Sequence, residues 1–271
     1  MTYTSKYKYL GYYISDSGNL SDDFELNVKD KRANLTIKYL NFCRTNFMAP
    51  LNIKLDVLNV CLKSSVLFGC EIWANSKLER IECCYRKATK NALSVRPSVN
   101  NEIAYIESGQ FPLVCDVKSR QLKFWLTLVA DAAKEPNCYM SKLINLATEK
   151  KISYIRYYKS LAESYASVKT CKANLQQQFL TKWTSRIEQC SADDGESKLG
   201  VYKQINPELQ QYSNNQTIPE FERIHITRYR TGSHNLKIEQ GRQSNTKRKQ
   251  TLHLQQRCTN FKSCNLLLSS H

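Results

Sequence analysis

Apolar residues recur at steps of three and four along most of the chain, which is the spacing of an amphipathic helix. Three such stretches precede Pro97: one capped by Ser21, one that begins near Asn52 and stops at Gly69, and one capped by Ser76. We expect the three helices to pack together as one unit. Their predicted buried stripes are, in chain order, Leu26, Ala33, Ile37 and Leu40; Ile53, Val57, Val60, Ser64 and Leu67; and Leu78, Ile81, Tyr85, Ala88 and Ala92.

The helical pattern continues beyond this unit. It predicts a short helix over 100–109, a longer one that Pro112 opens and that ends before Pro136, and a helical stretch over 153–190. The apolar positions of the longer helix are Leu122, Trp125, Leu126 and Val129. Gly and Pro, the main helix breakers, number only 8 and 6 in 271 residues, which favours a mainly helical chain.

One stretch near the N-terminus has a different period. Residues 6–15 alternate aromatic and β-branched side chains with polar ones and then reach Asp16–Asn19, a turn-forming cluster. This pattern predicts a strand that runs into a tight turn, ahead of the first helix.

Charge is unevenly distributed. The chain has 40 Lys and Arg against 24 Asp and Glu, a net charge of +16. The segment 223–262 holds ten basic residues and one acidic residue, Glu239, so its net charge is +9. Such a concentration favours phosphate backbones or an anionic membrane as the partner, and a solvated basic tail is an equal alternative.

Several classes of protein are excluded by what the sequence lacks. No apolar run approaches the roughly 18 residues that span a bilayer, and the N-terminus has no apolar stretch typical of a signal peptide, so we expect an intracellular protein of the nucleus or cytoplasm. The eleven cysteines are irregularly spaced, which predicts reduced thiols. All four histidines lie in the C-terminal region, so the helical body has no base for a Ser-His or Cys-His pair.

Four separated elements resemble a known family. They are Lys8-Tyr9-Leu10-Gly11; Ser-Val-Leu-Phe-Gly-Cys-Glu-Ile-Trp at 65–73; Gln-Leu-Lys-Phe-Trp at 121–125; and the segment Arg230–Arg242. In this order they resemble the end of the palm, the thumb and the downstream connection region of a non-LTR (LINE-type) retrotransposon reverse transcriptase.

The resemblance implies contacts with nucleic acid. Its primer grip corresponds to Tyr9, Leu10 and Gly11, and its thumb helices would place Lys29, Lys31, Arg32 and Lys38 along a duplex, although a charged outer face is equally expected of any amphipathic helix. In the basic segment, guanidinium and ammonium groups surround planar side chains that can stack on bases. The predicted binding residues are Tyr9, Leu10, Gly11, Arg223, Arg228, Tyr229, Arg230, His234, Lys237, Arg242, Lys247, Arg248 and Lys249.

The chain also departs from the family pattern. The paired catalytic aspartates would precede Lys8, where only a few residues stand, and the pair Asp193-Asp194 lies in a polar stretch that is typical of a solvated linker. The C-terminus lacks the Cys-x-x-Cys of the family's zinc knuckle. We therefore expect no cofactor and no zinc, with a shifted or decayed reading frame after Gly241. The weak metal candidates are His253, Cys258, Cys264 and His271.

These observations predict a mainly α-helical protein with a short N-terminal β-hairpin. Its expected parts are a hairpin with a thumb-like three-helix unit (1–97), a helical connection region (98–190), a linker with a short helix (191–222) and a basic, partly disordered segment (223–271). As a fragment of an RNA-directed DNA polymerase, it would bind RNA or DNA without sequence preference and would not polymerise by itself. The alternatives are a helical interaction or scaffold protein with a solvated basic tail, and a decayed element copy without function.

Overall fold

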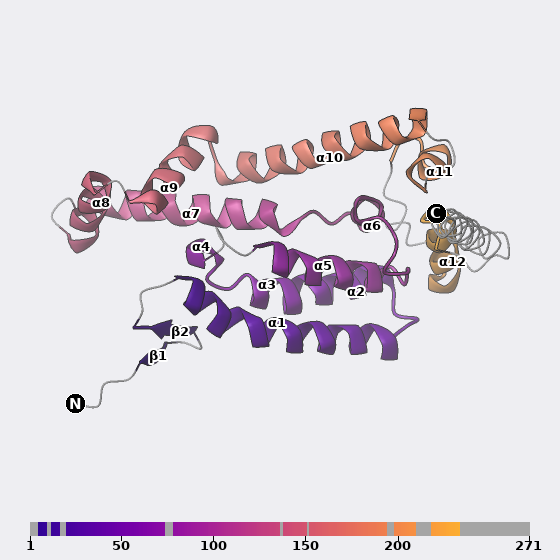
Figure 1. Ribbon diagram of the computed structural model, residues 1–271, viewed down its shortest axis with the longest axis horizontal. Coiled ribbons are helices and arrows are strands. Elements are labelled where there is room, and N and C mark those ends of the chain that lie inside the picture. The colour runs from indigo at the N-terminus through magenta and orange to yellow at the C-terminus, as the bar shows by residue number, and fades with distance from the viewer. Residues whose placement is uncertain are drawn as a thin grey trace, which may run out of the picture. The chain divides into compact units, whose positions relative to one another are not determined.

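The computed structural model describes residues 5–9, 12–16, 20–73, 78–135, 138–150, 152–193, 198–209 and 218–233. These residues are mainly helical, which confirms the predicted fold class (Figure 1). The chain divides into two compact units, Met1–Gly232 and Ser233–His271. The elements below belong to the first unit.

Two short strands come first. β1 (Lys6–Tyr9) and β2 (Tyr12–Ser15) pair in antiparallel fashion, with Tyr9 opposite Tyr12. The stretch predicted as one strand is therefore two strands that pair with each other, and all but the first residue of the predicted turn at Asp16–Asn19 lies outside the described residues. Because two strands by themselves are only marginally stable, the stable N-terminal hairpin stays a prediction.

The first helix buries a different stripe from the one predicted. α1 (Leu20–Thr45) buries Thr36, Tyr39 and Cys43, whereas Ile37 is 56% exposed. Leu35 and Phe42 pack beside the buried residues. The buried face therefore lies one position away from the predicted stripe, because it gathers more large side chains at steps of three and four.

The second helical segment shows a similar shift. α2 (Leu51–Val57), the π-helical turn η1 (Leu58–Lys63) and α3 (Ser64–Val66) follow one another without a break. Their buried face carries Leu51, Leu55, Leu58, Leu62 and Val66, and the predicted Ile53 and Val60 are exposed. A step of four residues is longer than one α-helical turn, so apolar residues at this spacing drift around an α-helix. The wider π-helical turn compensates for the drift and keeps the buried residues on one side.

The next helices agree with the sequence pattern. After α4 (Cys70–Trp73), α5 (Leu78–Ala92) buries Ile81, Tyr85, Ala88 and Ala92, as predicted. α6 (Asn101–Ser108) begins where the Asn100 side chain accepts a hydrogen bond from the Glu102 amide, and it ends at Gly109, whose φ of 62° closes the helix.

The second half of the unit has more helices than predicted. α7 (Leu113–Lys134) follows Pro112, and α8 (Tyr139–Glu149) was not foreseen. The stretch predicted over 153–190 is two helices, α9 (Ser153–Ser164) and α10 (Val168–Asp193), because Ser167 and Thr170 cap the second one by reciprocal hydrogen bonds. α11 (Lys198–Ile205) and α12 (Glu220–Arg230) follow.

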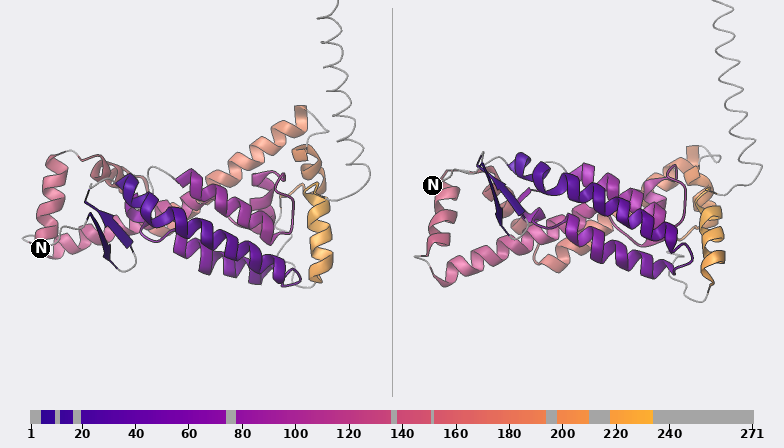
Figure 2. Two further views of the ribbon diagram at one scale, coloured as in Figure 1. Left: turned by 60° about the horizontal axis from the view of Figure 1, so that its bottom comes forward. Right: turned by 90° about the horizontal axis from the view of Figure 1, so that it is seen from below.

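Two groups of buried apolar residues hold the helices together. The larger joins α1, the α2–α3 segment, α5 and α6 to Trp183 and Ile187 of α10 and to Tyr202 of α11, and thus draws on both sides of the boundaries predicted at 97 and 190. Figure 2 shows α1 lying alongside the helices that follow it, and α1 packs against α5 and η1. A smaller group lies between α7, α9 and α10. Trp125 and Trp183 are both buried, and their rings stack on Tyr158 and Tyr105, so both serve packing.

Candidate nucleic-acid interface

Helix α12 carries four of the predicted binding residues, Arg223, Arg228, Tyr229 and Arg230. Acidic residues lie in its first turn and arginines in its last, which is the distribution that a helix dipole favours. The boundary predicted between 222 and 223 falls inside this helix. The part of the basic segment that the structure describes therefore begins within a helix.

Arg223 anchors α12 internally. Its side chain is 4% exposed, and its Nε and Nη2 atoms donate to the two carboxylate oxygens of Glu220 at 2.8 and 2.7 Å. The buried ammonium of Lys54 donates to the same carboxylate at 3.0 Å and to the carbonyl of Phe47 at 2.7 Å. The carboxylate of Glu220 thus joins α12 to α2 through Lys54, and Arg223 holds the same carboxylate from within α12.

The carboxylate of Glu220 is held in its ionised form. Burial by itself would raise its pKa, but the hydrogen bonds and charge of Arg223, followed by those of Lys54, outweigh burial. The pKa of Glu220 therefore lies below its ordinary value. Lys54, Glu220 and Arg223 are called the Glu220 cluster below, and at neutral pH its carboxylate is ionised.

The other two arginines of α12 contact different elements. Arg230 donates from Nε to the buried carboxylate of Glu107 on α6 at 2.9 Å, and the Tyr202 hydroxyl of α11 donates to the same oxygen at 2.7 Å. Arg228 donates from Nε to the carbonyl of Ser94 at 2.8 Å, just after the end of α5. In this arrangement Arg223 and Arg230 pair with carboxylates of the chain itself.

A hollow of about 460 Å³ lies beside Arg228, and we call it the Arg44 pocket. Its walls come from the C-terminal half of α1, the end of α5 and α12. Its polar lining residues are Asn41, Arg44, Asn91, Ser94 and Arg228. None of the described residues that line it is acidic, so its wall carries two guanidinium groups uncompensated by a lining carboxylate.

Two features shape the rim of the Arg44 pocket. Phe47 is 39% exposed, and the Lys54 ammonium, which binds its carbonyl, also lies 5.6 Å from its ring centre. Ser94 has a φ of 60°, a backbone conformation that a residue with a side chain adopts rarely. The Glu220 cluster therefore positions the aromatic ring at the rim as well as the helix that supplies Arg228.

The remaining predicted residues fall into three groups. Tyr229 is 54% exposed on α12, and Lys38 of α1 is exposed. Tyr9 lies in β1 and the cations at 29, 31 and 32 lie in α1, but their side chains are not described. Outside the described residues lie Leu10, Gly11, His234, Lys237, Arg242, Lys247, Arg248, Lys249, His253, Cys258, Cys264 and His271.

Other reactive chemistry is sparse in the described part of the chain. Its cysteines form no disulfide, and burial raises the pKa of the Cys70 and Cys115 thiols to about 12, which leaves them protonated and unreactive. No group of three or more His, Cys, Asp or Glu side chains that could hold a metal ion occurs among the described residues. None of the described helices has the length and apolar character needed to cross a membrane.

Sequence reasoning missed Arg44, Phe47 and Asn91, which the fold brings together with Arg228. The only local signal was a basic residue in the last turn of α1, a common position for a cation. No protein-family model, curated protein or solved structure matches this chain.

Proposed function

We propose that this protein binds RNA or DNA through the phosphates, without sequence preference, and that the Arg44 pocket is the binding site within the unit Met1–Gly232. The observation that carries the proposal is the composition of the pocket: two arginines and two asparagines around a hollow whose described lining has no carboxylate. The net charge of +16 adds a long-range attraction to polyanions.

Each lining group has a suitable role. A guanidinium group donates two parallel hydrogen bonds to a phosphate, and the bond from Arg228 to Ser94 restricts the orientation of one of the two groups. The amides of Asn41 and Asn91 are suited to sugar and phosphate oxygens, and the ring of Phe47 offers a face for an unpaired base. Contacts of these kinds position a strand without reading its sequence.

The four elements that resemble a LINE-type reverse transcriptase lead to a finer proposal. The chain would be a C-terminal portion of such an enzyme, with thumb and connection helices, and would hold nucleic acid without polymerising by itself. This part of the proposal depends on the sequence resemblance alone.

The test measures binding of the full chain to a short labelled single strand and to a short labelled RNA–DNA duplex. Fluorescence anisotropy at several salt concentrations is the readout. We expect Arg44→Ala to weaken both by about fivefold and to lower the slope of log affinity against log salt by about 1, because one phosphate contact is lost. The matched control is Arg156→Ala, which removes the same charge from an exposed position on α9.

The basic residues beyond 233 need a separate arm. A chain that ends at Pro219 would also lose α12 and its anchors, so the tail is better tested in the full chain with Lys247, Arg248 and Lys249 changed to Ala. If this variant weakens binding while Arg44→Ala behaves like Arg156→Ala, the tail binds nucleic acid and the proposed role of the pocket is rejected.

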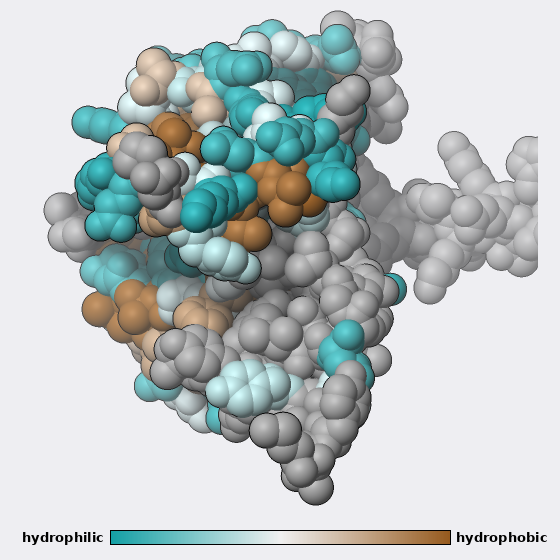
Figure 3. Space-filling view, turned by 90° about the vertical axis from the view of Figure 1, so that its left-hand side faces the viewer, coloured by the Kyte–Doolittle hydropathy of each residue, from teal (hydrophilic) through white to brown (hydrophobic). Residues whose placement is uncertain are grey.

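A second candidate function, the binding of a partner protein, is favoured by one observation. Helix α8 buries none of its side chains, and its apolar residues include Tyr139, 76% exposed, and Leu146, 50% exposed. On the face that Figure 3 shows, apolar side chains lie at the surface among hydrophilic ones. Salt separates the two functions, because apolar contacts do not weaken steeply as salt rises whereas phosphate contacts do.

A further inference from the structure

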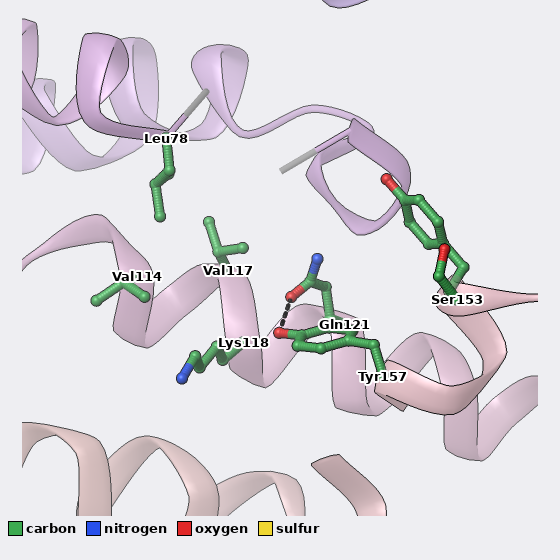
Figure 4. Close-up of a pocket in the computed structure, with 8 residues that line it drawn as sticks. Leu78, Val114, Val117, Lys118, Gln121, Ser153 and Tyr157 are labelled. Carbon is green, nitrogen blue, oxygen red and sulfur yellow. Dashed lines mark hydrogen bonds between the residues drawn. The ribbon is translucent and has the colours of Figure 1, made fainter. Parts of the chain in front are cut away.

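A second hollow, distinct from the Arg44 pocket, opens between α7 and α9. It has a volume of about 530 Å³, which is within the range of pockets that hold small molecules. Val114, Val117, Lys118 and Gln121 line it from one face of α7, and Tyr154 and Tyr157 line it from α9 (Figure 4). We call it the α7–α9 cavity.

The apolar part of the cavity has aliphatic and aromatic walls. In Figure 4 the side chains of Val114 and Val117 lie together with Leu78 of α5, and the ring of Tyr157 lies farther along α7, beside Gln121. Branched aliphatic groups and tyrosine rings make a lining that suits a flat apolar molecule better than a polar chain.

The polar part of the cavity has a fixed orientation. Gln121 is fully buried, and its Oε1 atom accepts a hydrogen bond of 3.0 Å from the Tyr157 hydroxyl. Burial raises the pKa of Tyr157, so this hydroxyl keeps its proton and its role as a donor at neutral pH. The pair therefore holds its polar atoms in place before any ligand arrives.

The charge of the cavity has one sign. Lys118 is the only charged residue among the described residues that line it, and its long stem lets the ammonium move toward a ligand. The nearest acid in sequence, Asp116, pairs with Lys63 at 2.5 Å and with Lys172 at 2.7 Å. The charge of this carboxylate is thereby compensated by cations other than Lys118.

From the apolar walls, the fixed polar pair and the single cation, we propose that the α7–α9 cavity binds a planar aromatic anion of about two fused rings. An anionic group would meet the Lys118 ammonium, and the rings would pack against Val114, Val117 and Tyr157. This site uses no residue of the Arg44 pocket, so it stands or falls independently of nucleic-acid binding.

The probe is 8-anilinonaphthalene-1-sulfonate, compared with N-phenyl-1-naphthylamine, which has the same rings without the sulfonate. Fluorescence titration of the full chain is expected to give saturable binding, tighter for the sulfonate. Lys118→Glu is expected to weaken sulfonate binding by about tenfold and to change binding of the neutral probe by less than about twofold, because it replaces an attraction by a repulsion. The matched control is Lys123→Glu, an exposed position on α7 that does not line the cavity.

A second pair of variants tests the volume. Val114→Trp fills the cavity and is expected to weaken both probes by about tenfold or more, whereas Val60→Trp places the same ring at a position that is 70% exposed on η1. If circular dichroism shows that Val114→Trp does not fold, the comparison of Lys118→Glu with Lys123→Glu decides the test. Lys118 is only partly buried, so its substitution is compatible with folding. Sulfonate binding that is insensitive to Lys118→Glu would overturn the proposal, and so would equal weakening of both probes by it.

Discussion

Helices α8 and α12 are both eleven residues long, yet they join the fold in opposite ways. α8 carries Tyr139, Met140, Leu143 and Leu146 and buries none of its side chains. α12 is mostly polar, and it buries Arg223, Ile224 and Thr227. The helix with the larger apolar surface is thus the more exposed of the two.

The difference lies in the partners that each helix finds. α12 reaches α2 through the Glu220 cluster, the end of α5 through Arg228, and α6 through Arg230. Charge-assisted hydrogen bonds to buried groups have a defined geometry, and leaving one partner unpaired is costly. Apolar content by itself does not determine which surface helix is held, whereas a set of specific polar partners does.

The largest expected effect comes from breaking the Glu220 cluster. Arg223→Ala leaves the carboxylate of Glu220 with Lys54 alone in a largely buried site, and we expect the free energy of unfolding to fall by about 3 kcal/mol. Urea denaturation followed by far-UV circular dichroism measures this loss, and limited proteolysis shows whether residues 218–233 become accessible to cleavage.

The control for this variant is Arg156→Ala, which truncates an exposed arginine of α9 and should change the free energy of unfolding by less than about 0.5 kcal/mol. Equal effects of the two substitutions would contradict the anchoring role of Arg223. The contrast between α12 and α8 would then have to come from Ile224 and the other apolar contacts of α12.

The contacts that anchor α12 also mark the limit of what local sequence patterns can predict. The steps of three and four placed α5, and Asn100 and Gly109 placed the ends of α6, because these signals act within a few residues. The partners of α12 are far along the chain: Glu220 and Lys54 are 166 residues apart, and Arg230 and Glu107 are 123 apart. A basic segment looks the same in a sequence whether its charges face solvent or such partners.

The buried faces of α1 and of the α2–α3 segment were predicted wrongly for a local reason. In α1 and in the α2–α3 segment the sequence offers two overlapping apolar stripes, and only packing against other helices selects one of them. The π turn at Leu58–Lys63 changes the helical period at that point, so a fixed period of 3.6 assigns Val60 to the core although it is exposed.

A smaller effect is expected from acid. Because the pKa of Glu220 is lowered in the folded protein, its contribution to stability is complete above the ordinary pKa of 4.5 and is lost as the pH falls through the lowered value. We expect Glu220→Gln to lower the melting temperature at pH 7 and to differ less and less from the unmodified protein as the pH falls below 4.5. A difference that stays constant down to pH 3 would contradict the ionised cluster.

The smallest effect is expected on α8. Leu146→Ser removes an apolar side chain that is already 50% exposed, so we expect the free energy of unfolding to change by less than about 0.5 kcal/mol. Leu122→Ser on α7 is the matched control, because this leucine is fully buried and its loss should cost about 3 kcal/mol. Urea denaturation of both variants measures the contrast.

A loss above about 1.5 kcal/mol for Leu146→Ser would mean that this side chain is covered in solution, since a half-exposed leucine has little burial to lose. If that loss also grew with protein concentration, the cover would be a second copy of the chain, and α8 would be held by an apolar interface as firmly as α12 is held by its arginines.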